Sequence, residues 1–270
     1  MKKKKVKLIL NSILLLSIVT ILLKDLNFNK LKEIFFQLDF FFLVPSIILS
    51  FIFPIILAIR WQIINERFQI KLSLLSSLKT IIFGQAGSTM AGVSFLNEII
   101  KFFRIDKKTD FVDKLKIIFV DKFISIAAKI FLISPLIFFL FFNHKNYFFF
   151  IYIVLLLFTL IIFYYICKKI NKLSFFILCS FAHNLFILVS YYFISLSLGV
   201  GIEFFYSIIF LIIELVTQIF SFWGTRELTS VYFLNILSIS KEKSILVGFL
   251  FTLTNLISLI FYIFFLKVKK

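Results

Sequence analysis

Long apolar runs bounded by lysines constrain this sequence more than any other feature. A membrane-spanning helix needs about 20 apolar residues, and six stretches come close to that length: 6–23, 40–59, 117–142, 147–167, 173–198 and 244–266. Apolar residues make up 61% of the chain, whereas a soluble domain holds roughly 45–50%. The sequence therefore predicts an all-α polytopic membrane protein and excludes a soluble enzyme, a disordered chain and a disulfide-rich secreted domain.

The charge of the chain follows the same pattern. Lys and Arg number 30 against 13 Asp and Glu, a formal net charge of +17. The lysines lie at the ends of apolar runs, which is typical of topology signals and of contact with anionic lipid head groups, and does not indicate nucleic acid as a partner. The positive-inside rule places the basic segments 60–79, 101–116 and 168–172, and both termini, in the cytoplasm.

Two apolar stretches are interrupted and do not fit as simple spans. Residues 80–100 contain Gly84, Gly87 and Gly92, and residues 203–239 are broken at 222–227. The charge pattern is satisfied if the first enters and leaves the membrane from the cytoplasmic side and the second from the outer side. The prediction is six full spans plus two opposed re-entrant helical hairpins, an inverted-repeat-like order typical of transporters.

Ionisable residues inside apolar segments are costly and need an explanation; here they are Asp121, Lys122, Lys129, His183, Glu203, Glu214, Arg226 and Glu227. Lys122 either takes part in a site or extends to the interface, and His183 is either a structural hydrogen-bonding group or a proton relay. Three readings stay open around the second break: Glu227 caps a helix, Arg226 pairs with Glu214, or Arg226 and the N–H groups after Gly224 bind a head-group phosphate.

Other residue patterns argue against chemistry of a soluble enzyme. The sequence has no Walker-type phosphate loop, no Gly-x-Ser-x-Gly and no His-Glu-x-x-His. Cys167 and Cys179 lack metal-type spacing. We therefore expect no catalytic residue, no metal and no cofactor, and we expect Trp61 and Trp223 to be interfacial anchors.

Four motifs occur in a recognisable order: Ala58-Ile59-Arg60-Trp61, then Gly84 with Asn97-Glu98-Ile99-Ile100-Lys101, then Asp121-Lys122, and finally Trp223-Gly224-Thr225-Arg226-Glu227. In this order the chain resembles the flippase-like family named after the transmembrane region of lysylphosphatidylglycerol synthase. It departs from the family pattern at Leu96 and Lys101, where Gly and Arg are usual, and at Gln218 and Phe222, where Pro and Gly are usual.

The resemblance implies one integral membrane domain over residues 1–270 in a bacterial or archaeal plasma (inner) membrane, which translocates an anionic phospholipid or lipid-linked glycan. The head-group binding residues expected on this basis are Arg60, Glu98, Lys101, Arg104, Asp121, Lys122, Glu214, Gly224, Arg226 and Glu227. The aminoacyl-transfer domain of the fused synthases is not found, so no enzyme activity is expected. The alternative is a non-transporting scaffold for a lipid synthase or glycosyltransferase of envelope biosynthesis.

Overall fold

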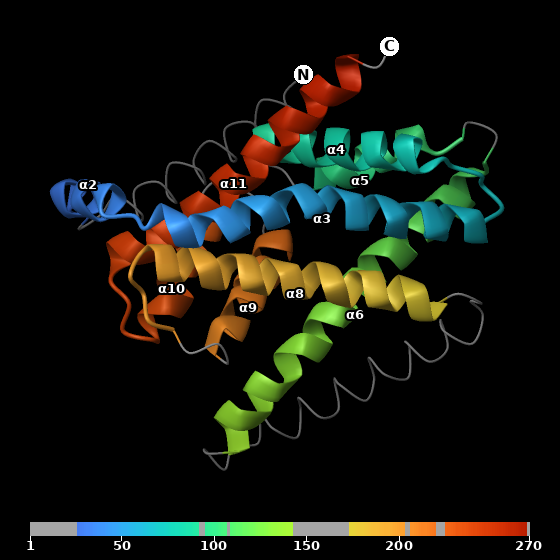
Figure 1. The fold of residues 1–270 in the computed structure, drawn as a ribbon. Helices are drawn as coiled ribbons and strands as arrows, with labels where there is room; N and C mark the ends of the chain where they lie inside the picture. The colour runs from blue at the N-terminus through green and yellow to red at the C-terminus, as the bar shows by residue number, and fades with distance from the viewer. Residues whose placement is uncertain are drawn as a thin grey trace, which may run out of the picture.

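A computed structural model describes residues 26–91, 95–106, 109–142, 173–202, 206–219 and 225–268. Every element in these ranges is helical (Figure 1): α2 (Phe28–Phe36), α3 (Phe40–Arg67), α4 (Leu74–Ala91), α5 (Phe95–Arg104), α6 (Phe111–Phe142), α8 (Leu173–Ser197), the short 3-10 helix η1 (Tyr206–Ile208), α9 (Ile209–Ile219), α10 (Thr225–Asn235) and α11 (Lys241–Val268). The all-α prediction is confirmed for this part of the chain. The predicted spans 6–23 and 147–167 lie outside it.

Three of the described helices are long and apolar enough to cross a membrane: Phe40–Arg67, Phe175–Ser197 and Lys241–Leu266. They correspond to three of the predicted spans, although α3 continues through Pro54 and beyond the predicted end at residue 59 to Arg67. A fourth predicted span, 117–142, falls within α6, whose first half is rich in charged residues. The chain is thus a helical membrane protein, and the number of six spans stays a prediction.

The helices α3 and α8 form an antiparallel central pair. At one end, the Asp39 amide donates to the Ser197 carbonyl over 2.9 Å, and the Lys243 Nζ donates to the nearby Gly199 carbonyl over 3.2 Å. The beginning of α3, the end of α8 and the beginning of α11 therefore lie together. These are the segments that the charge pattern assigns to the outer side.

Each interrupted stretch forms a pair of packed helices. In the first pair, α4 and α5 lie side by side (Figure 1), and Gly84 lies directly against the Asn97 side chain. The stretch is divided between Ala91 and Phe95, and Gly84 and Gly87 do not break the helix, because α4 runs through both of them to Ala91. The missing side chains instead let α5 approach: a Cβ on Gly87 would stand only 2.8 Å from Ile100 Cδ1.

The two helix pairs occupy opposite ends of the α3–α8 pair. The α9–α10 pair contributes Phe210 and Leu234 to a core that also contains Leu198, near the end of α8. The α4–α5 pair packs beside a second core that includes Ile64 of α3 and Phe176 at the beginning of α8. This arrangement fits two opposed pairs, while their re-entry into a membrane stays a prediction.

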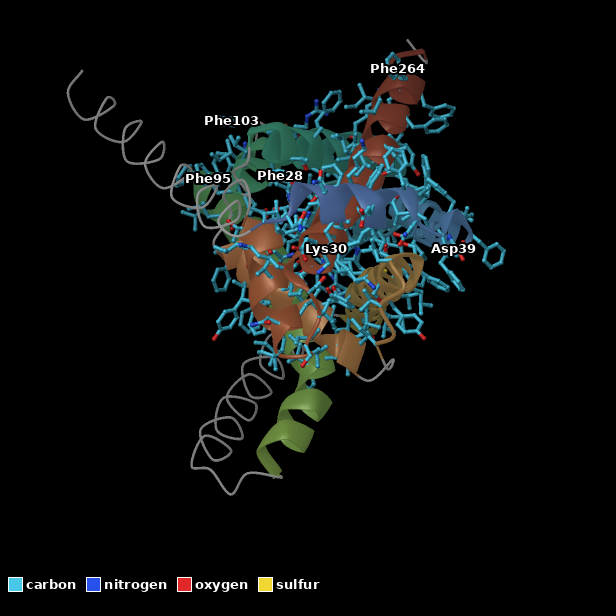
Figure 2. The ribbon with its side chains drawn as sticks, turned by 90° about the vertical axis from the view of Figure 1, so that its left-hand side faces the viewer. Phe28, Lys30, Asp39, Phe95, Phe103 and Phe264 are labelled. Carbon is cyan, nitrogen blue, oxygen red and sulfur yellow. The ribbon has the colours of Figure 1, made fainter. Side chains whose placement is uncertain are left out.

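The outer surface carries large aromatic side chains. Figure 2 shows Phe95, Phe103 and Phe264 on the periphery of the molecule, and Phe103 is 75% exposed. Such side chains are stable in lipid but not in water. Sequence reasoning missed the short helix α2. Asn27 caps the N-terminus of this helix, and its side chain accepts a hydrogen bond from the Lys30 amide.

Candidate functional site

A buried carboxylate joins three helices at the first predicted motif set. Asp121 Oδ1 of α6 forms an ion pair with Arg60 Nη2 of α3 at 2.8 Å. Its Oδ2 accepts from Lys101 Nζ of α5 over 2.7 Å. The three side chains are at most 5% exposed, so little water screens these charge-assisted contacts.

A second carboxylate extends this network towards the surface. Glu98 lies 3.4 Å from Lys101 Nζ through one oxygen and 3.3 Å from Lys122 Nζ through the other. Lys122 is 34% exposed. Both readings of Lys122 thus hold in part, because it is paired and also reaches the surface. We call this set of five residues, Arg60, Glu98, Lys101, Asp121 and Lys122, the Asp121 cluster.

Aromatic rings surround the cations of the Asp121 cluster. Lys101 Nζ lies 5.2 Å from the centre of the Trp61 ring, and the Arg60 guanidinium lies 5.9 Å from the Phe176 ring. Trp61 is almost fully buried, so the prediction that it anchors the chain at an interface is wrong. The Trp61 ring instead forms a cation–π contact with the buried Lys101 ammonium. Arg104 lies outside the cluster, exposed on α5 and 4.6 Å from the Phe83 ring.

A second ion pair links the two helices of the α9–α10 pair. Arg226 Nε donates to Glu214 Oε1 over 2.9 Å, and Arg226 Nη2 donates to Glu214 Oε2 over 3.5 Å. The pairing of these two residues, one of the alternatives that the sequence left open, is present in the structure. Arg226 Nη1 also donates to Thr252 Oγ1 of α11 over 2.9 Å, and the guanidinium lies 5.0 Å from the Phe251 ring. The Arg226 side chain is nevertheless 23% exposed.

Tyr191 of α8 completes this second site. Its hydroxyl donates to Glu214 Oε1 over 2.7 Å, and its ring is stacked between Phe210, at 4.8 Å, and Phe251, at 4.0 Å. Sequence reasoning missed Tyr191, because a tyrosine within an apolar run gives no signal of its partner. We call Tyr191, Glu214, Arg226 and Thr252 the Glu214 cluster.

The remaining predicted residues lie around the Glu214 cluster. Glu227 is in the first turn of α10, where a negative charge is favoured by the helix dipole. Gly248 of α11 allows α10 to approach, since a Cβ there would be 3.2 Å from Glu227 Cα. Gly224 lies outside the described residues, as does Glu203. Within the described ranges no group of three or more His, Cys, Asp and Glu side chains has the geometry of a metal site.

The family described as Lysylphosphatidylglycerol synthase TM region matches residues 8–169, more than half of the chain. The chain belongs to this family. Membership in the lysylphosphatidylglycerol synthase TM-region family indicates a membrane protein of lipid metabolism or of flippase type. The matched segment contains the whole Asp121 cluster, whereas the Glu214 cluster lies beyond it. Comparisons with curated proteins and with solved structures gave no match.

Proposed function

We propose that the protein is a flippase-like protein that translocates an anionic or modified lipid head group, either of a phospholipid or of a lipid-linked sugar. The observation that supports this most is the state of Arg226, a cation that is held inside a helical membrane protein and still partly exposed. A group of this kind needs a functional reason, because charge within a membrane segment is costly. In this proposal the protein moves the lipid and does not synthesise it.

The chemistry of Arg226 suits a phosphate-bearing ligand. A guanidinium offers a planar set of donors that matches phosphate and carboxylate oxygens, which an ammonium does not. Hydrogen bonds to Glu214 and to Thr252 hold the Arg226 side chain in place. Its position in the first turn of α10 adds the favourable potential of a helix N-terminus. Without a ligand, Arg226 is thus held in the Glu214 cluster, and the exposed part of its side chain is where a head group would first make contact.

The Asp121 cluster has a different role in the proposal. Arg60 and Lys101 are buried and paired with Asp121, so we assign them to fixing α3, α5 and α6 relative to one another, and not to collecting the head group as expected from the sequence. Arg104 and Lys122 keep exposed charge and are the better candidates for first contact with an anionic lipid.

A transport measurement tests the role of Arg226. Purified protein in vesicles of phosphatidylcholine with a fluorescently labelled phosphatidylglycerol is treated with a membrane-impermeant quencher, and the rate of lipid exchange is followed. We expect wild-type protein to accelerate lipid exchange. R226Q should exchange lipid at least roughly 10-fold more slowly than the wild type, which is the effect of losing one strong charge-assisted contact. R226K keeps the charge without the planar donor set, so an intermediate rate is expected.

The control is K116Q on α6. Lys116 is an exposed cation, paired with Asp113 at 2.9 Å, and its loss should leave exchange unchanged. If R226Q and R226K, both folded, exchange lipid as fast as the wild type, Arg226 is not the head-group site.

A second candidate function is a non-transporting scaffold for a lipid synthase or glycosyltransferase of envelope biosynthesis. The internal pairing of Arg60 and Lys101 favours it, because cations that are already neutralised have less to offer a ligand. No exchange by the wild-type protein, together with a synthase or glycosyltransferase that copurifies with it, would decide for the scaffold.

A further inference from the structure

Lys129 of α6 is a buried lysine that belongs to neither cluster. Its side chain has no exposed surface, and its Nζ has no hydrogen-bond partner among the residues that the structure describes. An unpaired ammonium in such an environment destabilises a fold, so the charged form of Lys129 calls for a partner in some other state of the protein.

The position of Lys129 points to Glu214 as that partner. The helix that carries Lys129, α6, packs against α9, which carries Glu214. Glu214 also exerts the strongest attraction that Lys129 experiences. The cations of the two clusters repel it: Lys122, Arg60 and Arg226. Lys129 is therefore influenced by charges of both clusters, and Glu214 is the carboxylate that favours its charged form.

The contacts of Glu214 leave room for a further donor. Its Oε1 accepts two short hydrogen bonds, from Tyr191 and from Arg226 Nε. Its Oε2 accepts only the long contact of 3.5 Å from Arg226 Nη2, which is at the limit of a hydrogen bond. The oxygen with the weaker contact is thus the one that a second cation would occupy.

We propose that Lys129 is a second counter-ion for Glu214, which takes over when Arg226 binds an anionic head group. The inference rests on the proposed function of Arg226 and adds a residue to that site. When Arg226 turns to the ligand, Glu214, which is 6% exposed, would otherwise remain as a buried charge without a cation. In its protonated form, Lys129 replaces the missing ion pair by a movement of its own side chain.

A double-mutant cycle on stability tests the exchange without any lipid substrate. Thermal and denaturant unfolding in detergent are compared for wild type, K129M, R226Q and K129M/R226Q. We expect K129M alone to leave the unfolding equilibrium constant unchanged or to make the protein more stable, because Met fills the same space without an unpaired charge. In the R226Q background the same change should destabilise by roughly 100-fold or more in that constant, because Glu214 then has no cation.

A conservative variant separates counter-ion exchange from simple packing. K129R in the R226Q background should keep the stability of R226Q alone, since it retains a cation beside Glu214. Additive effects of K129M and R226Q, or equal destabilisation by K129M in both backgrounds, would overturn the exchange. This outcome is independent of the vesicle assay: lost coupling with normal lipid exchange refutes Lys129 alone, whereas intact coupling without lipid exchange refutes the transport role of Arg226.

Discussion

Replacing Asp121 by Asn is expected to be among the most damaging single changes in the protein. Both oxygens of Asp121 bind cations, at 2.8 Å from Arg60 and 2.7 Å from Lys101, and all three side chains are at most 5% exposed. In D121N the two cations lose the negative charge between them and remain buried. Removing one partner of a buried ion pair costs about 3–5 kcal/mol, which corresponds to a fall in the unfolding midpoint on the order of 10 °C.

The assay is thermal unfolding in detergent, followed by tryptophan fluorescence, to which Trp61 beside Lys101 contributes. The matched control is D113N on the same helix, because Asp113 pairs with Lys116 at 2.9 Å but the two side chains are 45% and 59% exposed. That variant should lose less than about 1 kcal/mol. Equal midpoints for D121N and D113N would refute the reasoning that burial decides the energy of these pairs.

Two further predictions concern the second helix pair and the topology. G248V should lower the free energy of unfolding by about 1–3 kcal/mol and slow lipid exchange, because a side chain there meets Ser230 Oγ at 3.1 Å and separates α10 from α11. G201V is the control, at a glycine with no neighbour within 4 Å, and should behave as wild type. Similar losses of stability in both variants would contradict the packing argument. Reporter fusions after Asp110 and after Ser240 should report cytoplasm and exterior respectively. The segment 101–116 is basic and is therefore expected inside, whereas Ser240 lies just before α11, whose beginning the charge pattern assigns to the outer side. The reverse result would contradict the opposed orientation of the two helix pairs.

The sequence predicted those parts of the fold that depend on local composition. The helices α3, α8 and α11 follow from apolar runs of spanning length. The pairing of Glu214 with Arg226 was also within reach, because both residues lie within one interrupted stretch and are opposite in charge.

A carboxylate role for Asp121 beside basic side chains could be expected from the sequence, but the buried three-helix contact that it forms was beyond local reasoning. Its two partners, Arg60 and Lys101, are distant in sequence and come from different helices, so only tertiary packing decides that all three meet. Gly84 shows the same limit. A glycine in an apolar stretch either allows an unusual backbone conformation or makes room for a neighbouring helix. Gly84 makes room, because a Cβ there would collide with the Asn97 side chain of α5.

Each of the two clusters neutralises a buried carboxylate, but with different numbers of cations. The Asp121 carboxylate has two direct cations, so the loss of one would still leave a charge partner for it. The Glu214 carboxylate has one direct cation, Arg226, together with a neutral tyrosine hydroxyl. If Arg226 is the residue that leaves its carboxylate to bind a head group, the Glu214 cluster is the one that needs a second cation nearby. Lys129, buried and without a partner among the described residues, is the group in the fold that meets this need.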